Sequence, residues 1–536
     1  MATVTDSNLY FSRDTKVFVQ KTKETAALQA NFASGDTVIK FTDALGVKVS
    51  IGDSLKNATG VLIGIVTAIS RGNTNVTNCT VAATSVAGTA ADVITIEKPV
   101  YEIPVLDGFS FTQATNASEV TLAEMASSTG TSRRGRRMFT DSYSPAEWSF
   151  QTYARPYKSA GSVAGNPHSA SHTHAVEEVM WALFAGDANK DDDGDSFAAS
   201  PSSAGTTQYM TSDATDLNIN FSQSNKVTLG TADIFFVLGG SSSSNSSASP
   251  SIAAAADDSN VTIQFADAAA IAGVQQGDLI SVQGKNVKGV VKTVNFATDG
   301  TTAAAGRIIL TDPLNTAIAA TDTVQFNRAL CYKIEKCVVN EAAFEFDIDG
   351  IASINWSGNG TIIAESAIPT ASIAEGITST DSFIRNRLTS LTAVSSVSGS
   401  SVSYDLVLTG GSVTLSNNLT FITPEQLGQV NQPFAHVTGG RNVGGSFTCY
   451  LNTGDDSSAE LFDDLLAANT TITNSFDLTF KVGGSANPRV EINAPSCHLE
   501  LPSHSIEDVI SVETNFHALP STISSSDEVT LTYVAP

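Results

Sequence analysis

The sequence predicts a mainly β protein: two tandem β-sandwich or barrel units, each flanked by one short α-helix, plus two small inserted β modules. Three observations predict this fold class. Only 15% of the 536 residues are charged, and short Val/Ile/Phe runs are separated by Ser, Thr, Ala and Gly, as in strands joined by turns. One ordered series of elements occurs twice, and a shorter series also occurs twice, which indicates internal duplication.

The longer series starts at Tyr101 and again at Tyr404. Each copy has an apolar strand, a long polar arm, a strand with the pattern Ser-Phe-x-x-Tyr, a helix, another strand and a final hairpin. The Ser-Phe pair is Ser149-Phe150 in one copy and Ser446-Phe447 in the other. The later elements occupy 178–184, 233–239 and 332–357 in the first copy, and 457–467, 477–483 and 490–516 in the second.

Both predicted helices carry apolar residues at i, i+1, i+4 and i+5, which places one apolar stripe on each helix. In the first helix these positions begin at Val179, and in the second they begin at Leu461. Ser457 and Glu460 have the spacing of a capping box at the start of the second helix. Each helix is therefore expected to lie with one face on a β-sheet.

The shorter series consists of an alternating apolar strand, a Gly-Asp turn, a Val/Ile-rich strand and a final strand. Its two occurrences end just before Tyr101 and Tyr332, so we expect small β modules beside core strands. The repeats together predict an N-terminal arm (1–33), module 1 (34–98), copy 1 (99–256 and 329–366), module 2 (257–328), a linker (367–403) and copy 2 (404–536).

Charge and cysteine content exclude several classes of protein. The formal net charge of −25 predicts a surface that repels nucleic acid unless basic residues are gathered in one place. The five cysteines are odd in number and form no Cys-x-x-Cys, so buried free thiols are expected rather than disulfides or zinc ligands. The N-terminal residues lack the pattern of a signal peptide, and the apolar run 61–66 is too short to cross a membrane.

Basic residues are gathered on the arm of copy 1, at Arg133, Arg134, Arg136 and Arg137. The corresponding arm of copy 2 carries Arg441. An arginine cluster can contact phosphates, but on an acidic chain it more readily meets carboxylates of a neighbouring subunit. These five arginines are therefore predicted as inter-subunit arm residues.

Two other stretches suggest metal binding, and neither is complete. His168, His172 and His174 can ligate zinc, but they lie in a Ser-rich turn without a counterpart in copy 2, so a solvated lead-in to the helix is favoured. The segment 187–195 resembles a calcium loop, but Ser200 stands where the bidentate Glu belongs, so an exposed acidic loop is favoured. No metal or cofactor is predicted, and no catalytic signature occurs, so we expect no enzyme.

The order of these elements resembles the tail tube proteins of long-tailed bacteriophages and the inner-tube proteins of contractile injection systems. The closest stretch is 404–516, which includes GGRNVGGSFTCYLN, SAELFDDLLA and HSIEDVISVETNFHAL. The resemblance implies six core units in a ring, rings stacked into a tube, and an arm that reaches an adjacent ring or subunit. With two copies per chain, three chains would build one ring.

The resemblance further implies a structural virion protein of the phage tail, assembled in the host cytoplasm. Its partners would be copies of itself and other tail proteins, with no membrane. Double-stranded DNA would pass through the lumen without specific binding. Two alternatives remain open: another repetitive virion protein (sheath, baseplate or decoration), or a secreted carbohydrate-binding or calcium-binding β protein.

Overall fold

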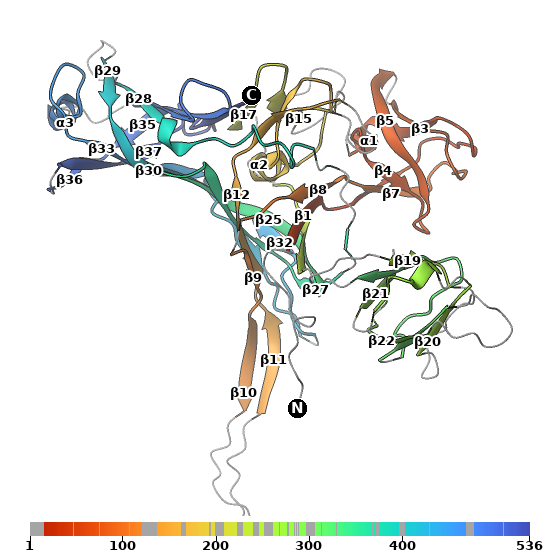
Figure 1. The fold of residues 1–536 in the computed structure, drawn as a ribbon. Helices are drawn as coiled ribbons and strands as arrows, with labels where there is room; N and C mark the ends of the chain where they lie inside the picture. The colour runs from red at the N-terminus through yellow and green to blue at the C-terminus, as the bar shows by residue number, and fades with distance from the viewer. Residues whose placement is uncertain are drawn as a thin grey trace, which may run out of the picture. The chain divides into compact units, whose positions relative to one another are not determined.

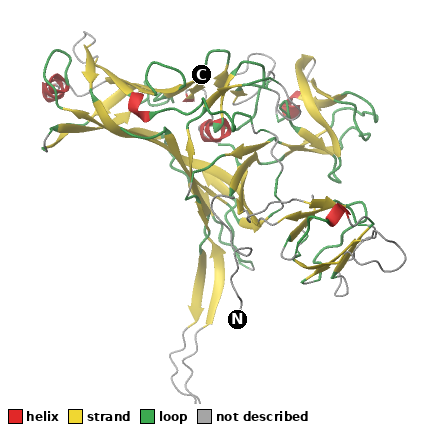
Figure 2. Ribbon diagram, viewed as in Figure 1, coloured by secondary structure: helices red, strands yellow, loops and turns green. Residues whose placement is uncertain are grey.

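Strands dominate the computed structural model (Figure 2), and the mainly β fold class predicted from the sequence is confirmed. The chain forms two compact units, which are described separately. The smaller comprises residues up to Phe18, 234–334 and 363–370, and the larger comprises 19–233, 335–362 and 371–536. The structure describes residues 15–536 except 47, 74–75, 107, 121–136, 162–167, 192–193, 199–207, 222–228, 239–245, 251–260, 267–268, 276–277, 283–284, 286, 288, 296–305, 312, 328–329, 367, 370–372, 374, 396–401, 428, 468–475 and 507–508.

The smaller unit contains two three-stranded antiparallel sheets, in the orders β19-β24-β21 and β20-β23-β22. Alternating residues of these strands point inward, and Phe265 and Phe326 meet edge to face with ring centroids 5.8 Å apart. The strands are β19 (Ser246–Ala248), β20 (Thr262–Phe265), β21 (Leu279–Val282), β22 (Val291–Asn295), β23 (Gly306–Leu310) and β24 (Val324–Asn327), and a 3-10 turn spans Ala269–Ile271. β27 (Ile363–Glu365) also belongs to this unit.

Within the larger unit, module 1 (34–98) forms a six-stranded sheet in the order β2-β7-β4-β5-β6-β3, to which β2 is contributed by the segment predicted as the N-terminal arm. Its inward side chains, such as Ile39, Phe41 and Ile96, form a core of their own. The elements are β2 (Glu24–Ala27), β3 (Val38–Thr42), α1 (Asp43–Gly46), β4 (Ser54–Lys56), β5 (Leu62–Asn73), β6 (Val76–Val81) and β7 (Val93–Glu97). Alternation of apolar and polar residues along these strands explains the core, because successive side chains point to opposite faces.

The rest of the larger unit is built on one sheet that runs through both copies, here called the long sheet. Antiparallel pairings give the strand order β9-β12-β26-β25-β30-β33-β37-β36. The strands are β9 (Ser110–Thr112), β12 (Ala146–Tyr153), β26 (Ser353–Gly360), β25 (Leu330–Asp347), β30 (Leu408–Ser416), β33 (Asn442–Tyr450), β37 (Ser511–Ala518) and β36 (Ser503–Ser505). Copy 1 and copy 2 join where Glu341–Asp347 of β25 pairs with Gly410–Ser416 of β30.

A second run of strands, here called the covering sheet, also passes through both copies, and it joins the long sheet where Cys497–Leu499 of β35 pairs with Phe516–Ala518 of β37. Its strand order is β15-β16-β17-β38-β35-β34-β28-β29. The strands are β15 (Phe197–Ala198), β16 (Gln208–Ser212), β17 (Leu217–Asn220), β38 (Thr530–Val534), β35 (Arg489–Leu499), β34 (Phe476–Val482), β28 (Ser390–Ser395) and β29 (Val402–Leu406). β38 lies between β17 of copy 1 and β35 of copy 2, so it joins the two copies.

Aromatic side chains fill the space between the two sheets. In copy 2, Phe480 of the covering sheet lies 5.5 Å from Phe346 and 5.6 Å from Phe516 of the long sheet, between ring centroids. In copy 1, helix α2 (Glu178–Ala185) supplies Trp181, whose ring lies 4.7 Å from that of Trp356. Trp181 Nε1 also donates a 2.7 Å hydrogen bond to Tyr533 of β38, so the helix contacts both sheets.

The two helices differ from the expectation of one buried face each. All eight residues of α2 are buried, including Glu178, because the helix is enclosed on every side. The single apolar stripe predicted for this helix is therefore wrong. In α3 (Ser458–Ala467), Leu461 and Leu465 of the predicted stripe are buried, but Leu466 is exposed, so the buried face is narrower than predicted. Ser457 Oγ accepts the backbone N–H of Glu460 at 3.4 Å, which agrees with the predicted cap.

The remaining elements of the larger unit connect and decorate the two sheets. β28 lies inside the interval expected to link the copies, and it pairs with both β29 and β34. The other elements are β8 (Val100–Ile103), β10 (Thr115–Val120), β11 (Arg137–Tyr143), β13 (Pro156–Lys158), β14 (Thr173–Ala175), β31 (Thr420–Ile422), β32 (Ala435–Val437) and a 3-10 turn (Asn386–Leu388). Strands β1 (Lys16–Lys21), β18 (Ala232–Leu238) and β25 contribute residues to both units.

Candidate assembly surfaces and a buried histidine cluster

One face of the long sheet packs on the core, and the other, here called the open face, carries polar side chains. The register aligns the open-face positions in rows across the strands, for example Gln151, Asn355, Ala343 and Thr414. Ser, Thr and Asn dominate these rows, and the residues there are exposed or half-buried. Five residues of the open face are charged, and all are acidic: Glu147, Glu341, Glu345, Asp347 and Glu513. This holds for the strand segments Glu147–Tyr153, Ser353–Asn359, Glu341–Asp347, Gly410–Ser416, Asn442–Tyr450 and Ser511–His517.

The open face therefore has acidic groups and, at the described positions just given, neither Lys nor Arg. Such a surface repels phosphate and offers no counter-charge to it. Sequence reasoning did not identify these residues, although the alternation of Glu341, Ala343, Glu345 and Asp347 with apolar neighbours was visible. The sequence alone does not give the register of strand pairing, and this register shows that the acidic positions of separate strands lie on one face.

Two hairpins project between equivalent strands of the long sheet. Arm 1 is formed by β10 and β11 between β9 and β12, and arm 2 by β31 and β32 between β30 and β33. Arm 1 extends away from the sheet in Figure 1. The arms are joined by their backbones: Tyr143 donates to the carbonyl of Asn431 at 2.9 Å, and Asn431 donates to that of Asp141 at 3.1 Å.

The arms expose large apolar side chains, which sequence reasoning missed because it concentrated on the arginines. Among the described residues of the two arms, the large exposed apolar ones are Met138, Phe139, Ile422, Leu427, Val430, Phe434 and Val437. Exposed apolar groups clustered on a projecting element are typical of a surface that binds a partner.

The predicted arm arginines are placed only in part. Arg133, Arg134 and Arg136 lie outside the described residues, and Arg137 is described by its backbone, which pairs with Val120 in arm 1. Arg441 lies at the base of arm 2, and its side chain is largely buried. The inter-subunit role of these arginines stays a prediction.

Within one chain, Arg441 connects the two copies. Its guanidinium lies 3.6 Å from Glu528 and 4.7 Å from the ring centroid of Phe221 in copy 1. Burial lowers its pKa, while Glu528 acts in the opposite direction. Neighbouring Asn417 donates to the backbone carbonyl of Phe184 at 3.0 Å, which ties copy 2 to the end of α2.

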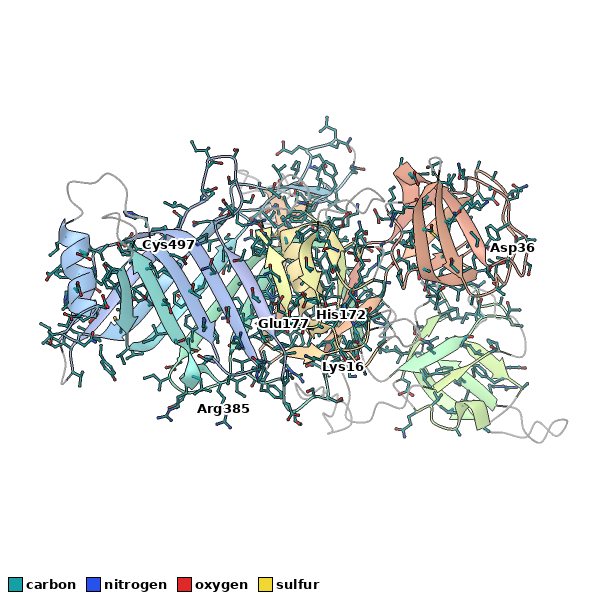
Figure 3. The ribbon with its side chains drawn as sticks, turned by 90° about the horizontal axis from the view of Figure 1, so that it is seen from above. Lys16, Asp36, His172, Glu177, Arg385 and Cys497 are labelled. Carbon is teal, nitrogen blue, oxygen red and sulfur yellow. The ribbon has the colours of Figure 1, made fainter. Side chains whose placement is uncertain are left out.

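A second candidate site is a group of buried polar residues around the start of α2, here called the histidine cluster. Figure 3 shows His172 and Glu177 beside the same group of strands. The cluster consists of His168, His172, His174, Glu178, Lys190 and Asp195. Of these only His172 is appreciably exposed, so the expectation of a solvated lead-in to the helix is wrong for His168 and His174.

The cluster combines basic and acidic groups at hydrogen-bond distance. His174 Nδ1 lies 2.7 Å from Glu178 Oε2, and its Nε2 lies 3.4 Å from Asp195 Oδ1. Lys190 Nζ lies 2.6 Å from His168 Nε2, where the neutral imidazole accepts from the ammonium group. His168 also approaches Glu375, with 3.5 Å between Nδ1 and Oε2.

The shifts in pKa follow these contacts. Burial, then Lys190 and His174, lower the pKa of His168. Burial alone would lower the pKa of His174, but Glu178 and Asp195 outweigh it and the pKa lies above its usual value. Burial alone would raise the pKa of Glu178, but His174 and Lys190 hold it well below its usual value. The cluster thus favours ionised Glu178, protonated His174 and neutral His168.

Candidate ligand atoms of His168, His174 and Glu178 lie within 4.8 Å of one another, but their geometry does not suit a metal. The two imidazole rings are stacked, with centroids 3.8 Å apart and planes 10° apart. A metal bound by imidazole nitrogen lies near the ring plane, and two stacked parallel rings have no such point in common. The ammonium group of Lys190 also lies beside His168, where it would repel a metal cation.

The acidic segment 187–195 is not the exposed loop that the sequence suggested. Asn189, Lys190, Asp191 and Asp195 are all buried. Asp195 accepts the backbone N–H of Ser169 at 2.7 Å. Burial alone would raise the pKa of Asp195, but its hydrogen bonds with His174 and Ser169 outweigh burial and lower the pKa to about 2. The exposed-loop expectation is therefore wrong for these residues, because their partners lie in other parts of the chain, such as Lys21 for Asn189, His168 for Lys190 and Gln208 for Asp191.

All five cysteines are buried free thiols, as the sequence predicts. Cys497 lies among the strands of copy 2 in Figure 3. In the described part of the chain, no helix is long and apolar enough to cross a membrane.

The joined sheets, the acidic open face and the projecting arms have the features expected of a phage tail tube protein, the class that the sequence resembles. No protein-family model matches the chain. It is 32% identical over 205 residues to the tail tube protein pb6 of Escherichia phage T5, a similarity that covers 36% of this chain and 44% of that relative. The chain thus matches less than half the length of this relative. The similarity supports the phage tail tube protein family, in agreement with the resemblance noted from the sequence.

Proposed function

We propose that this chain is a structural subunit of a phage tail tube. The partial similarity to pb6 supports this role and implies a location in the virion tail. A passive conduit needs no nucleophile or cofactor, so we propose no enzymatic activity. Its partners would be further copies of itself and other tail proteins.

One observation carries the proposal furthest: copy 1 and copy 2 are consecutive parts of one continuous sheet. A sheet with two free ends can be extended by further copies, and it loses its exposed edges if it closes. We propose closure by three chains, which would give six core units around a ring. Symmetry-free class averages of the purified assembly test this, because a ring of six whole chains contradicts it.

The open face of the long sheet is proposed to line the lumen. Its rows of Ser, Thr and Asn with scattered carboxylates would let DNA slide without binding, since the described positions of this face offer neither Lys nor Arg to the phosphates. A sheath, baseplate or decoration protein would not require such a face. Electron microscopy of the purified protein separates the tube role from the baseplate and decoration roles, because the tube role predicts hollow tubes of stacked rings.

Replacing Glu341, Glu345 and Glu513 with Lys should make assembled tubes retain DNA. Each substitution replaces a carboxylate on the open face with an ammonium group, and the binding should weaken steeply with salt. A gel-shift assay on assembled tubes measures it. The matched Gln variants remove charge without adding cations and should bind far less. If the Lys variant forms tubes and still fails to bind DNA at low salt, the open face does not line the lumen.

The two arms are proposed to contact the next ring. They project together, and they combine exposed apolar groups with the predicted arginines. Replacing Arg133, Arg134, Arg136 and Arg137 with Ser should leave the protomer folded and shorten the tubes, because individually weak ion pairs are repeated around every ring.

Circular dichroism checks the fold of this arginine variant, and sedimentation measures the tubes. Replacing Met138 and Phe139 with Ser is the matched apolar variant. Unchanged tube yield in the arginine variant, with loss in the apolar one, would show that the arm stacks by its apolar residues.

A further inference from the structure

The long sheet has two ends, and the structure contains a template for joining them. β9 lies at the end in copy 1, and β36 lies at the end in copy 2. The two copies meet in the middle, where β25 of copy 1 pairs antiparallel with β30 of copy 2. If the copies are equivalent, an end-to-end junction between two chains should repeat this internal junction.

Residue equivalences across the copies define which strands would meet. Ser149 of β12 and Ser446 of β33 are equivalent by sequence, and their strand partners are Ser110 and Ser412. β9 is therefore the counterpart of β30. Thr112 then corresponds to Thr414 on the same strands.

The hairpins at the other end give the second half of the template. The β25–β26 hairpin closes with Glu345 opposite Ser353, and the β36–β37 hairpin closes with Ser505 opposite Ser511. Ser505 therefore corresponds to Glu345, and β36 is the counterpart of the end of β25. In the internal junction, Glu345 lies opposite Ser412.

We propose that β36 of one chain pairs antiparallel with β9 of a second copy, with Ser505 opposite Ser110 and Ser503 opposite Thr112. The inference rests on the proposed tube function and names the contact that would close the ring. It places His504 opposite Phe111, as Phe344 lies opposite Val413 in the internal junction.

The exposure of the two ends supports this pairing. All three residues of β36 are exposed, and so are Ser110 and Thr112 of β9. Natural sheet edges are usually protected by charge, proline or a cover. β36 is Ser-His-Ser, and beside it Leu501 and Ile506 are 61% and 81% exposed. An edge of this kind suits burial against another copy of the chain.

The pairing can be tested with paired cysteines. Residues directly opposite each other in antiparallel strands have Cα atoms about 4.5–5.5 Å apart, which a disulfide can span. Ser505→Cys combined with Ser110→Cys should therefore give chains linked end to end under mild oxidation of the assembled protein, seen as covalent dimers and trimers on non-reducing gels. The five native cysteines are buried, so they should contribute little background.

Three controls make the result specific. Glu345→Cys with Ser412→Cys copies the internal junction and should cross-link within one chain, whether or not the protein assembles. Ser505→Cys with Ser149→Cys shifts the second cysteine one strand further, about 4.8 Å, and should link poorly. Each single variant should give no end-to-end series.

The outcomes separate this inference from the proposed function. If microscopy shows rings or tubes and the internal control cross-links, but Ser505→Cys with Ser110→Cys does not, the proposed pairing is wrong while the tube role stands. If the protein forms neither rings nor tubes, the tube role itself fails. Equal linking by the Ser149 control would also overturn the register.

Discussion

Replacing Lys98 with Met should destabilise module 1 by about 3–5 kcal/mol, because it leaves the buried carboxylate of Asp53 without its cation. Lys98 Nζ lies 2.7 Å from Asp53 Oδ2, and both side chains are almost fully buried. Burial raises the pKa of Asp53 although Lys98 lowers it, and burial lowers the pKa of Lys98 although Asp53 raises it. Desolvation thus exceeds the attraction within the pair, and a lone Asp53 would be more costly still.

Hydrogen exchange at the amides of β4 and β7 measures this loss locally, and a loss of 3 kcal/mol corresponds to an acceleration of more than about a hundredfold. Lys56→Met is the matched control in the same sheet, because Lys56 pairs with Glu97 in a more exposed position and should cost about 0–1 kcal/mol. Adding Asp53→Leu to Lys98→Met should recover much of the stability. If Lys98→Met exchanges no faster than Lys56→Met, the buried pair does not hold the module together.

Replacing Glu178 with Gln should destabilise copy 1 by about 3–5 kcal/mol at pH 7, because the variant keeps the shape and removes the anion of the histidine cluster. Protonated His174 and Lys190 would then lack their shared carboxylate, while His168 lies 3.5 Å away. The folded-state pKa of Glu178 is well below 4.5, so its stabilisation is present above that value and is lost as the pH falls through the folded pKa. The difference from the unsubstituted protein should therefore shrink in acid.

The neighbouring Glu177 provides a matched control, because its pKa is shifted in the opposite direction to that of Glu178. Burial raises its pKa to about 7, so any stabilisation from its proton is present below the ordinary 4.5 and is lost as the pH rises through about 7. Glu177→Gln should cost little at pH 7, since Arg155 can still donate its backbone N–H to the amide oxygen. Thermal unfolding measured from pH 7 down to pH 2 compares both variants. Equal losses for both at pH 7 would show that the charge of Glu178 is not what stabilises the cluster.

The mainly β class and the places of several strands and helices were predictable because each element carries its own periodicity. The Ser-Phe pairs, the helix bounds and the cap at Ser457 all follow from residues close in sequence. The burial of α2 was not predictable, because its second covering comes from distant strands such as β38. The histidine cluster was misjudged for the same reason: His168 meets Lys190 and Glu375, and no local pattern predicts those partners.

The candidate surfaces, too, were predictable only where residues close in sequence determine them. Alternation in each strand identifies which residues avoid the core, but only the register across β25 and β30 reveals that their acidic groups share a face. The apolar residues of the arms were visible in sequence, yet apolar residues are normally assigned to the core. Their exposure follows from the projection of the hairpins, which depends on how the flanking strands pair.

The position of β38 has a consequence for synthesis. This strand completes the covering sheet of copy 1 by pairing with β17, and Asn218 bonds Thr532 across 314 residues of sequence. A ribosome adds roughly 5–20 residues per second. β38 is therefore synthesised many seconds after the last residues of copy 1. During that interval copy 1 lacks the strand that joins it to copy 2. A nascent copy 1 therefore cannot take its finished form ahead of copy 2, which couples subunit maturation to translation of both halves.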